Sequence, residues 1–121
     1  MAEVLVVDDD AECCRALVQL FERSGHAAHC VYGGGEALEV LQAVRFKLVL
    51  LDLRMPGIGG MEVLKTLRAN GAHQETPVVI VSAEGSGPAV ETALAAGANG
   101  YVHKPVRWNN LYQRVQGFLE S

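Results

Sequence analysis

The chain of 121 residues has only three cysteines, Cys13, Cys14 and Cys30, and two of them are adjacent. An odd number of thiols with an adjacent pair does not form the disulfide framework of a small secreted protein. A domain of this length buries roughly two-thirds of the surface that its unfolded chain exposes, so it needs neither disulfides nor a structural metal. We therefore expect reduced, mostly buried thiols in a single domain over residues 1–121.

The sequence also lacks long apolar runs and an excess of positive charge. None of its apolar runs approaches the roughly 18 residues of a membrane span, and its start, Met1-Ala2-Glu3, lacks the basic residues of a secretory signal. Ten Lys and Arg stand against 14 Asp and Glu, for a formal net charge of −4. Binding to a phosphate backbone generally requires a basic face, so we expect no direct nucleic acid binding, no membrane insertion and a cytoplasmic location.

Short apolar runs predict the strands. Residues 4–7, 48–51 and 78–81 are uninterrupted runs of Val, Leu and Ile. Strands that are apolar on both faces are typical of a parallel sheet covered by helices on each side. Two weaker candidates, residues 27–31 and 100–103, bring the expected number of strands to about five.

Helical patterns alternate with these strands. Apolar residues recur at the spacing of one helix face around residues 13–21, 37–41, 61–67, 90–94 and 111–119. Glycine, Asn-Gly and proline stand near the expected helix limits. The alternation predicts right-handed crossovers and an α/β fold, with a doubly wound five-stranded parallel sheet flanked by five helices.

Chemically reactive side chains follow four of the predicted strands. In chain order they are Asp8-Asp9-Asp10, Asp52, Ser82 and Lys104. The carboxyl ends of parallel strands meet at one edge of such a sheet, where functional sites lie. Asp8, Asp9 and Asp52 should therefore converge although they are far apart in the sequence. Like charges at this distance repel one another unless a cation lies among them.

The expected cluster favours Mg²⁺ and phosphate chemistry. Mg²⁺ prefers oxygen ligands, keeps several waters and accepts phosphate oxygens. A carboxylate can attack a phosphoryl group to form an aspartyl phosphate, while Mg²⁺ and a lysine neutralise charge on the transferred oxygens. Lys104 supplies a point charge for this chemistry, and the Ser82 hydroxyl supplies a hydrogen-bond donor.

At this point the sequence resembles the receiver domains of two-component response regulators, including single-domain chemotaxis and sporulation phosphorelay proteins. Four segments carry the resemblance: VVDDD at 6–10, LLDLRMPG at 50–57, VSA at 81–83 and AGANGYVHKP at 96–105. Each segment alone is modest, but together and in this order they are highly specific. The resemblance covers essentially the whole chain and implies a flavodoxin-like receiver fold.

The resemblance implies a metal site and a phosphoacceptor. Asp52 would accept the phosphoryl group. Asp9 would bind Mg²⁺ directly, and Asp8 would act largely through a water. The backbone carbonyl of Arg54 would supply another ligand, and no organic cofactor is implied.

The resemblance also implies a switch. Lys104 would bind the phosphoryl group, Ser82 would be the switch hydroxyl, and Tyr101 would be the aromatic residue whose rotation reports phosphorylation. A cis bond between Lys104 and Pro105 is implied as well, since X-Pro bonds adopt cis at little cost.

Four positions shape secondary expectations. Asp10 should cap the first helix, whereas Arg107 lacks a capping side chain, so the last helix should start late. Arg54 and Glu84 would flank the phosphoryl group and could pair, which would restrict the attacking water. Trp108 either packs against the core or anchors a partner, and the sequence leaves both open.

The leading hypothesis is a signalling switch that catalyses its own phosphorylation and dephosphorylation and is not an enzyme acting on an external substrate. A sensor histidine kinase or a phosphotransfer protein would donate the phosphoryl group from a phosphohistidine. The switch would then change its affinity for a downstream protein or a linked output domain. Dimerisation on phosphorylation is left open.

Two alternatives come from other classes. An aspartyl-nucleophile phosphatase usually carries a second acid two residues after the nucleophile, where this chain has Arg54. A pseudo-receiver would keep the fold as a constitutive interaction module, but such modules commonly lose one of the site residues present here. A dinucleotide-binding domain is disfavoured because three aspartates follow the first strand in place of a glycine-rich turn.

Overall fold

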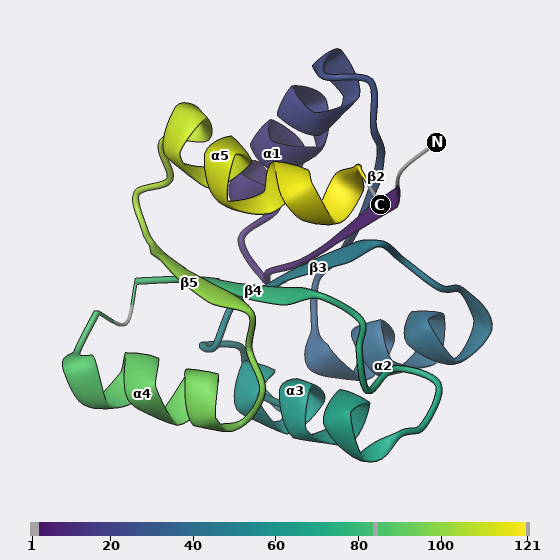
Figure 1. The fold of residues 1–121 in the computed structure, drawn as a ribbon, viewed down its shortest axis with the longest axis vertical. Helices are drawn as coiled ribbons and strands as arrows, with labels where there is room; N and C mark the ends of the chain where they lie inside the picture. The colour runs from purple at the N-terminus through teal and green to yellow at the C-terminus, as the bar shows by residue number, and fades with distance from the viewer. Residues whose placement is uncertain (1–2, 84, 121) are drawn as a thin grey trace.

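The computed structural model describes residues 3–83 and 85–120 (Figure 1). In this part of the chain, strands and helices alternate from end to end. In chain order they are β1 (Glu3–Val7), α1 (Ala11–Arg23), β2 (Ala27–Val31), α2 (Gly34–Ala43), β3 (Leu48–Leu51), α3 (Gly60–Ala69), β4 (Val78–Ser82), α4 (Gly87–Ala95), β5 (Gly100–His103) and α5 (Trp108–Leu119). Glu84 falls outside the described residues, and so does the expected pairing of Arg54 with it.

The strands form one sheet in the order β2-β1-β3-β4-β5, and every neighbouring pair is parallel. This order reverses direction at β1, as in doubly wound flavodoxin-like folds. In β1 and β3, Val7 pairs with Leu51 at the carboxyl ends. The predicted five-stranded doubly wound sheet is confirmed, and the residues that follow β1 and β3 are direct neighbours at one edge.

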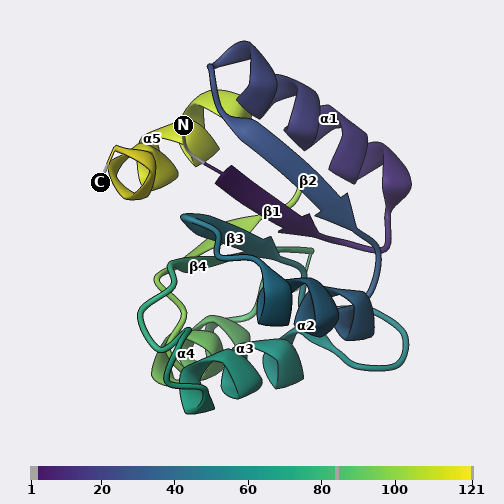
Figure 2. The same cartoon turned by 90° about the vertical axis from the view of Figure 1, so that its right-hand side faces the viewer.

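Two helical layers cover the sheet (Figures 1 and 2). α1 and α5 lie over one face, and α2, α3 and α4 lie over the other. Alternate residues of β1 therefore enter different cores: Leu5 and Val7 pack with α2 to α4, whereas Val4 and Val6 pack with α1 and α5. Burial on both faces explains why the strands are uninterrupted apolar runs. Among the described residues, no helix combines the length and apolarity that a membrane span requires.

The helices begin and end mostly as the sequence predicts. The Asp10 carboxylate accepts hydrogen bonds from the backbone N–H groups of Glu12 and Cys13, at 3.0 and 3.3 Å, and so caps α1 as expected. Gly97 follows α4 with φ at +110°, a conformation that suits glycine. Leu94 departs from the core pattern expected for α4, because its side chain is 46% exposed while Ala93 is buried.

Arg68, at the end of α3, links this helix to two loops, the one that precedes β4 and the one that follows α4. Its guanidinium donates to the carbonyls of His73 and Thr76 before β4, at 3.0 and 2.9 Å. It also donates to the Gly97 carbonyl and to Asn99 Oδ1, both at 3.0 Å, in the loop after α4. These four hydrogen bonds fix the last turn of α4 against the start of β4.

The N-terminus of α5 lacks a side-chain cap, because Arg107 stands at that position and makes no capping hydrogen bond. We expect Arg107→Ser to raise the free energy of unfolding by about 1 kcal/mol, since a serine hydroxyl can accept from a free backbone N–H of the first turn. Urea unfolding would measure the change. Arg107→Ala is the control, and equal stability of the two variants would contradict the prediction.

Candidate functional site

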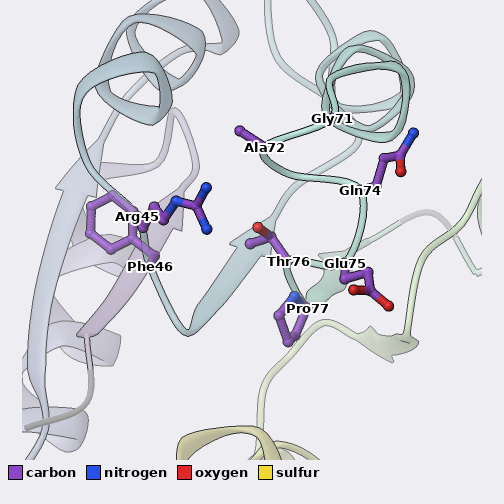
Figure 3. Close-up of a pocket in the computed structure, with 8 residues that line it drawn as sticks. All are labelled: Arg45, Phe46, Gly71, Ala72, Gln74, Glu75, Thr76 and Pro77. Atoms are coloured by element: carbon purple, nitrogen blue, oxygen red, sulfur yellow. The ribbon is translucent and has the colours of Figure 1, made fainter.

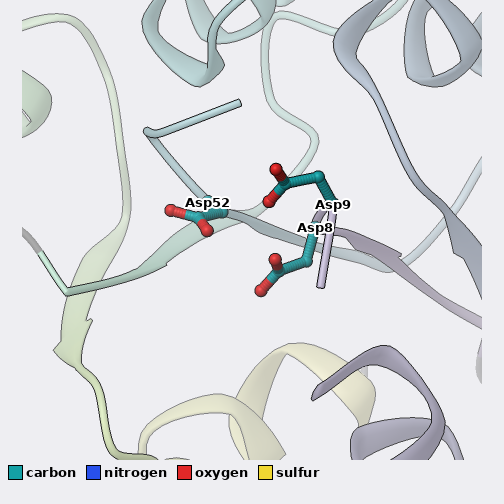
Figure 4. Close-up of side chains that lie close together, drawn as sticks. All are labelled: Asp8, Asp9 and Asp52. Atoms are coloured by element: carbon teal, nitrogen blue, oxygen red, sulfur yellow. The ribbon is translucent and has the colours of Figure 1, made fainter. Parts of the chain in front are cut away.

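Three carboxylates meet at the edge of the sheet where β1 and β3 end (Figure 4). Asp8, Asp9 and Asp52 each offer an oxygen within 4.8 Å of the other two. The Asp52 N–H donates to the carbonyl of Val7 at 3.0 Å, so the pairing of β1 with β3 continues one residue into the site. Asp8 and Asp52 are 2% and 6% exposed, whereas Asp9 is open to solvent. The predicted convergence of these three side chains is confirmed.

Lys104 lies between the two buried carboxylates. Its Nζ is 2.7 Å from Asp8 Oδ2 and 3.1 Å from Asp52 Oδ2. Burial by itself lowers the pKa of this amine, but the hydrogen bonds to Asp8 and Asp52 outweigh burial and hold the pKa above its ordinary value. Lys104 is therefore a permanent cation at neutral pH. The peptide bond between Lys104 and Pro105 is cis, as the resemblance implies.

Both buried carboxylates are oriented in the same way. The second oxygen of Asp8 accepts from the Asp10 N–H at 2.9 Å, and that of Asp52 accepts from the Arg54 N–H at 3.1 Å. Each carboxylate thus accepts a hydrogen bond from the lysine with one oxygen, and from the backbone N–H two residues later in the chain with the other. The Arg54 amide contacts the site in this way, and a ligand role for its carbonyl stays a prediction.

The donor set fits Mg²⁺. All three converging groups are carboxylates, and oxygen is the ligand that Mg²⁺ prefers. One lysine balances one of the three carboxylates, which leaves two negative charges in excess when all are ionised. A divalent cation would neutralise this excess.

Ser82 and Tyr101 lie on the neighbouring strands of the same edge. Ser82 is the last residue of β4, between the strands that precede Asp52 and Lys104, and it is fully buried. Its carbonyl accepts from the Lys104 N–H at 2.9 Å. Tyr101 in β5 is 6% exposed and packs with the core on the α2 to α4 face. Their switch roles stay predictions, since these contacts establish position alone.

Two cysteines of α1 lie beside the site, which the sequence did not predict. Cys14 Sγ donates to the backbone carbonyl of Asp8 at 3.3 Å, and the Cys13 thiol is near enough to the Asp8 carboxylate for its charge to act on the thiol. Burial and the negative charge of Asp8 raise the pKa of Cys13 to about 11. The sequence did contain one sign that these cysteines lie near the site: the predicted helix starts directly after the aspartates, so its first turn must lie beside them.

We expect Cys13 to react about tenfold more slowly with iodoacetamide at pH 8 than the same residue in the unfolded chain. The raised pKa lowers its thiolate fraction about a hundredfold, and the greater nucleophilicity of a more basic thiolate recovers about half of that factor on a logarithmic scale. Peptide mass mapping in native buffer and in urea would give both rates. Equal rates would contradict the predicted effect.

A surface hollow at the opposite end of the sheet is less suited to chemistry (Figure 3). It lies where the chain enters β3 and β4. Its lining residues are Arg45, Phe46, Gly71, Ala72, Gln74, Glu75, Thr76 and Pro77. Arg45 and Glu75 are its charged residues, both are exposed, and they are of opposite sign. The carboxylate edge is therefore the better candidate.

Known proteins resemble this chain over nearly its whole length. Residues 4–116 match the response regulator receiver domain family. The chain is 35% identical over 118 residues to the uncharacterized transcriptional regulatory protein YkoG of Bacillus subtilis, covering 98% of this chain and 51% of YkoG. A Francisella response regulator receiver domain superposes with a TM-score of 0.91 at 30% identity, over 99% and 98% of the two chains. The Vibrio cholerae chemotaxis response regulator CheY4 gives 0.91 at 29% identity, over 98% and 99%.

Proposed function

Because the chain belongs to the response regulator receiver domain family, we propose that it is a switch in which Asp52 accepts a phosphoryl group. Receiver domains are phosphorylation-dependent signalling domains of two-component systems. The observation that carries the proposal for this chain is Lys104, whose ammonium lies between the Asp8 and Asp52 carboxylates. A cation held at this point is suited to binding an anionic phosphoryl group next to a carboxylate nucleophile.

The residues divide into a metal site and a phosphoryl site. Asp8, Asp9, Asp52 and the backbone carbonyl of Arg54 would hold Mg²⁺, which supplies charge neutralisation at the phosphoryl oxygens when it is bound. Asp52 then forms an oxygen–phosphorus bond while the phosphorus–nitrogen bond of a partner's phosphohistidine breaks. The hydrogen bond from the Arg54 N–H holds one oxygen of Asp52 and leaves the other to react.

Lys104 and Ser82 would receive the transferred group. The ammonium of Lys104 exchanges its contact with Asp52 for one with a phosphoryl oxygen. The Ser82 hydroxyl, at the end of β4 between β3 and β5, donates to another phosphoryl oxygen. Tyr101 then changes orientation, and the surface over α4 and β5 changes with it. A downstream protein or a linked output domain senses this change.

The partners follow from this chemistry. A sensor histidine kinase or a phosphotransfer protein donates the phosphoryl group. The chain spans about half the length of YkoG, whose name describes a transcriptional regulatory protein, so an output domain on the same polypeptide is one form of the downstream partner.

The intact mass after incubation with Mg²⁺ and acetyl phosphate tests the proposal. We expect the wild type to gain one phosphoryl group and Asp52→Asn to gain none. Asp10→Asn is the matched control, because asparagine also caps a helix and Asp10 lies outside the carboxylate cluster. Omission of Mg²⁺ should prevent the gain.

Three results would contradict the proposal. A gain by Asp52→Asn would place the acceptor elsewhere. No gain by the wild type, together with no response to beryllofluoride, would indicate a pseudo-receiver. Multiple turnover of small phosphate esters would indicate a phosphatase.

A further inference from the structure

His103 lies beside both residues of the proposed switch. Its ring centroid is 5.2 Å from that of Tyr101, with the two planes tilted by 49°. The two residues are two apart in β5, so their side chains share a face of the strand. His103 also pairs with Ser82 in the register of β4 and β5. The imidazole is thus next to the tyrosine ring at the end of the strand pair that contains the switch hydroxyl.

His103 also lies near Gly85, in the loop that follows Ser82. A Cβ atom added to Gly85 would lie 3.3 Å from His103 Nδ1 and 3.6 Å from Cε1. The backbone at Gly85 therefore lies close to the imidazole, and an added methyl group would require the ring to move by a few tenths of an ångström. The imidazole is in contact with the loop at one side and with Tyr101 at the other.

Tyr101, His103 and Gly85 differ in their exposure to solvent, and this difference bears on which of them can move. Tyr101 is 6% exposed, whereas His103 and Gly85 are open to solvent. Among the described residues, no hydrogen bond or ion pair joins His103 to the carboxylates of the site. In the described part of the chain the imidazole lies against the Tyr101 ring and near the backbone at Gly85, so it can follow a displacement of the loop without disturbing a hydrogen bond to Asp8 or Asp52.

We propose that His103 is a positioning residue that couples the loop after Ser82 to Tyr101. This inference rests on the proposed function. When Ser82 and its loop move toward a phosphoryl group on Asp52, the contact at Gly85 changes and the imidazole moves with it. The face of His103 against Tyr101 then shifts, and the orientation of the tyrosine changes. The ring of His103 is the physical link, so the coupling depends on its size and shape and not on a proton.

The coupling can be measured on Tyr101 itself. The chain has three tyrosines, Tyr32, Tyr101 and Tyr112, so 3-fluorotyrosine labelling gives three fluorine NMR signals. Tyr101→Phe assigns the signal of interest. We expect beryllofluoride with Mg²⁺ to shift this signal in the wild type, and His103→Ala to reduce the shift by more than half. His103→Phe, which keeps a ring, should restore it.

Phosphoryl uptake and a second histidine provide the controls. Uptake from acetyl phosphate, measured by intact mass, should stay within about twofold of the wild type in every His103 variant, since the carboxylates and Lys104 are unchanged. His29→Ala is the matched control, because His29 is also an exposed strand histidine against an aromatic ring, that of Phe46. It should leave the Tyr101 signal unaltered.

The outcomes separate this inference from the proposed function. A full Tyr101 shift in His103→Ala, or a failure of His103→Phe to restore it, overturns the coupling role while leaving phosphorylation intact. A wild type that gains no phosphoryl group overturns both proposals. A wild type that gains the group but shows no Tyr101 shift overturns the coupling role and the proposed movement of Tyr101, while leaving phosphoryl acceptance by Asp52 intact.

Gly85→Ala tests the second contact independently. Its added methyl group would press on the imidazole, so the variant should move the Tyr101 signal even without beryllofluoride. In the His103→Ala background the same methyl group keeps only an ordinary contact, with the Ala83 carbonyl oxygen at 3.9 Å, and should have little effect. Non-additivity of this kind is expected for residues that are in contact or share a local backbone shift, and not for independent sites. Equal effects in the two backgrounds would exclude transmission through His103.

Discussion

Lys104→Ala is expected to lower the free energy of unfolding by about 3 kcal/mol in the absence of divalent cations. The substitution leaves Asp8 and Asp52, at 2% and 6% exposure, as neighbouring buried charges without their counterion. Losing one partner of a buried pair is costly because the other charge stays desolvated. Since the Lys104 side chain is itself 21% exposed, we expect the lower end of the usual range.

The same variant should lose phosphoryl transfer. Removing one fixed cation or donor from the reacting oxygens typically costs about a hundredfold in rate, and we expect a loss of this size in uptake from acetyl phosphate. Urea unfolding and intact mass would measure the two effects. Lys65→Ala, on the exposed side of α3, is the control for loss of a lysine and should change neither quantity.

Mg²⁺ gives this prediction a further test. A divalent cation that binds the native carboxylates stabilises the folded state in proportion to its occupancy and should narrow the stability deficit of Lys104→Ala. The lost rate should not recover, because in the proposed mechanism the lysine itself contacts the phosphoryl group. If Lys104→Ala had the wild-type urea midpoint without Mg²⁺, the stability of the folded state would not depend on the pairing of this amine with the carboxylates, and the prediction would be wrong.

Gly60→Ala should also cost about 3 kcal/mol, for a steric reason. Gly60 is the first residue of α3, and a Cβ there would overlap the carbonyl oxygen of Asp52 and lie 2.8 Å from Leu53 Cα. These are backbone atoms of the segment that leaves β3, so they cannot rotate away as a side chain would. The strand end must shift, and with it the carboxylate of Asp52, the proposed acceptor, so phosphoryl uptake should fall together with stability.

Gly87→Ala is the matched control for this effect. Gly87 is the first residue of α4, and a Cβ at that position meets nothing within 4 Å. Alanine should therefore change the free energy of unfolding by no more than about 0.5 kcal/mol, because the lower entropy of the unfolded chain is offset by the steric restriction that Pro88 places on the residue before it. Both substitutions add one methyl group at the first residue of a helix, so a large drop in the urea midpoint for Gly60→Ala alone isolates the close approach. Equal shifts would rule it out.

Strand placement could be predicted because each strand has a distinctive local pattern. The run at 48–51 matches β3 residue for residue, and the weaker segments at 27–31 and 100–103 match β2 and β5. The run at 4–7 missed Glu3, and the run at 78–81 missed Ser82, since polar residues at strand ends interrupt the apolar pattern. The convergence of Asp8 and Asp52 followed from the parallel sheet, which brings strand ends together whatever their separation in sequence.

The contacts made across loops could not be predicted in this way. A cationic residue in the last turn of α3 suits the helix dipole, and nothing local indicated that Arg68 donates to carbonyls in two other loops. The sequence placed His103 in a strand, where it lies, but its contact with Gly85 depends on the path of the following loop. Cys13 fitted the pattern of an apolar helix face, which gives no sign that its thiol lies beside the charge of Asp8.

The hydrogen bonds of Arg68 have a consequence for how α4 can move. They hold the end of this helix near Gly97 in place, whereas its other end directly follows the loop that lies near His103. The nine residues of α4 form a lever arm of roughly 13 Å, so a rotation of about 10° displaces its free end by roughly 2 Å and its anchored end hardly at all. A partner protein bound to the first turn of α4 would therefore meet a displaced surface, whereas one bound beside Gly97 would meet an almost unchanged surface.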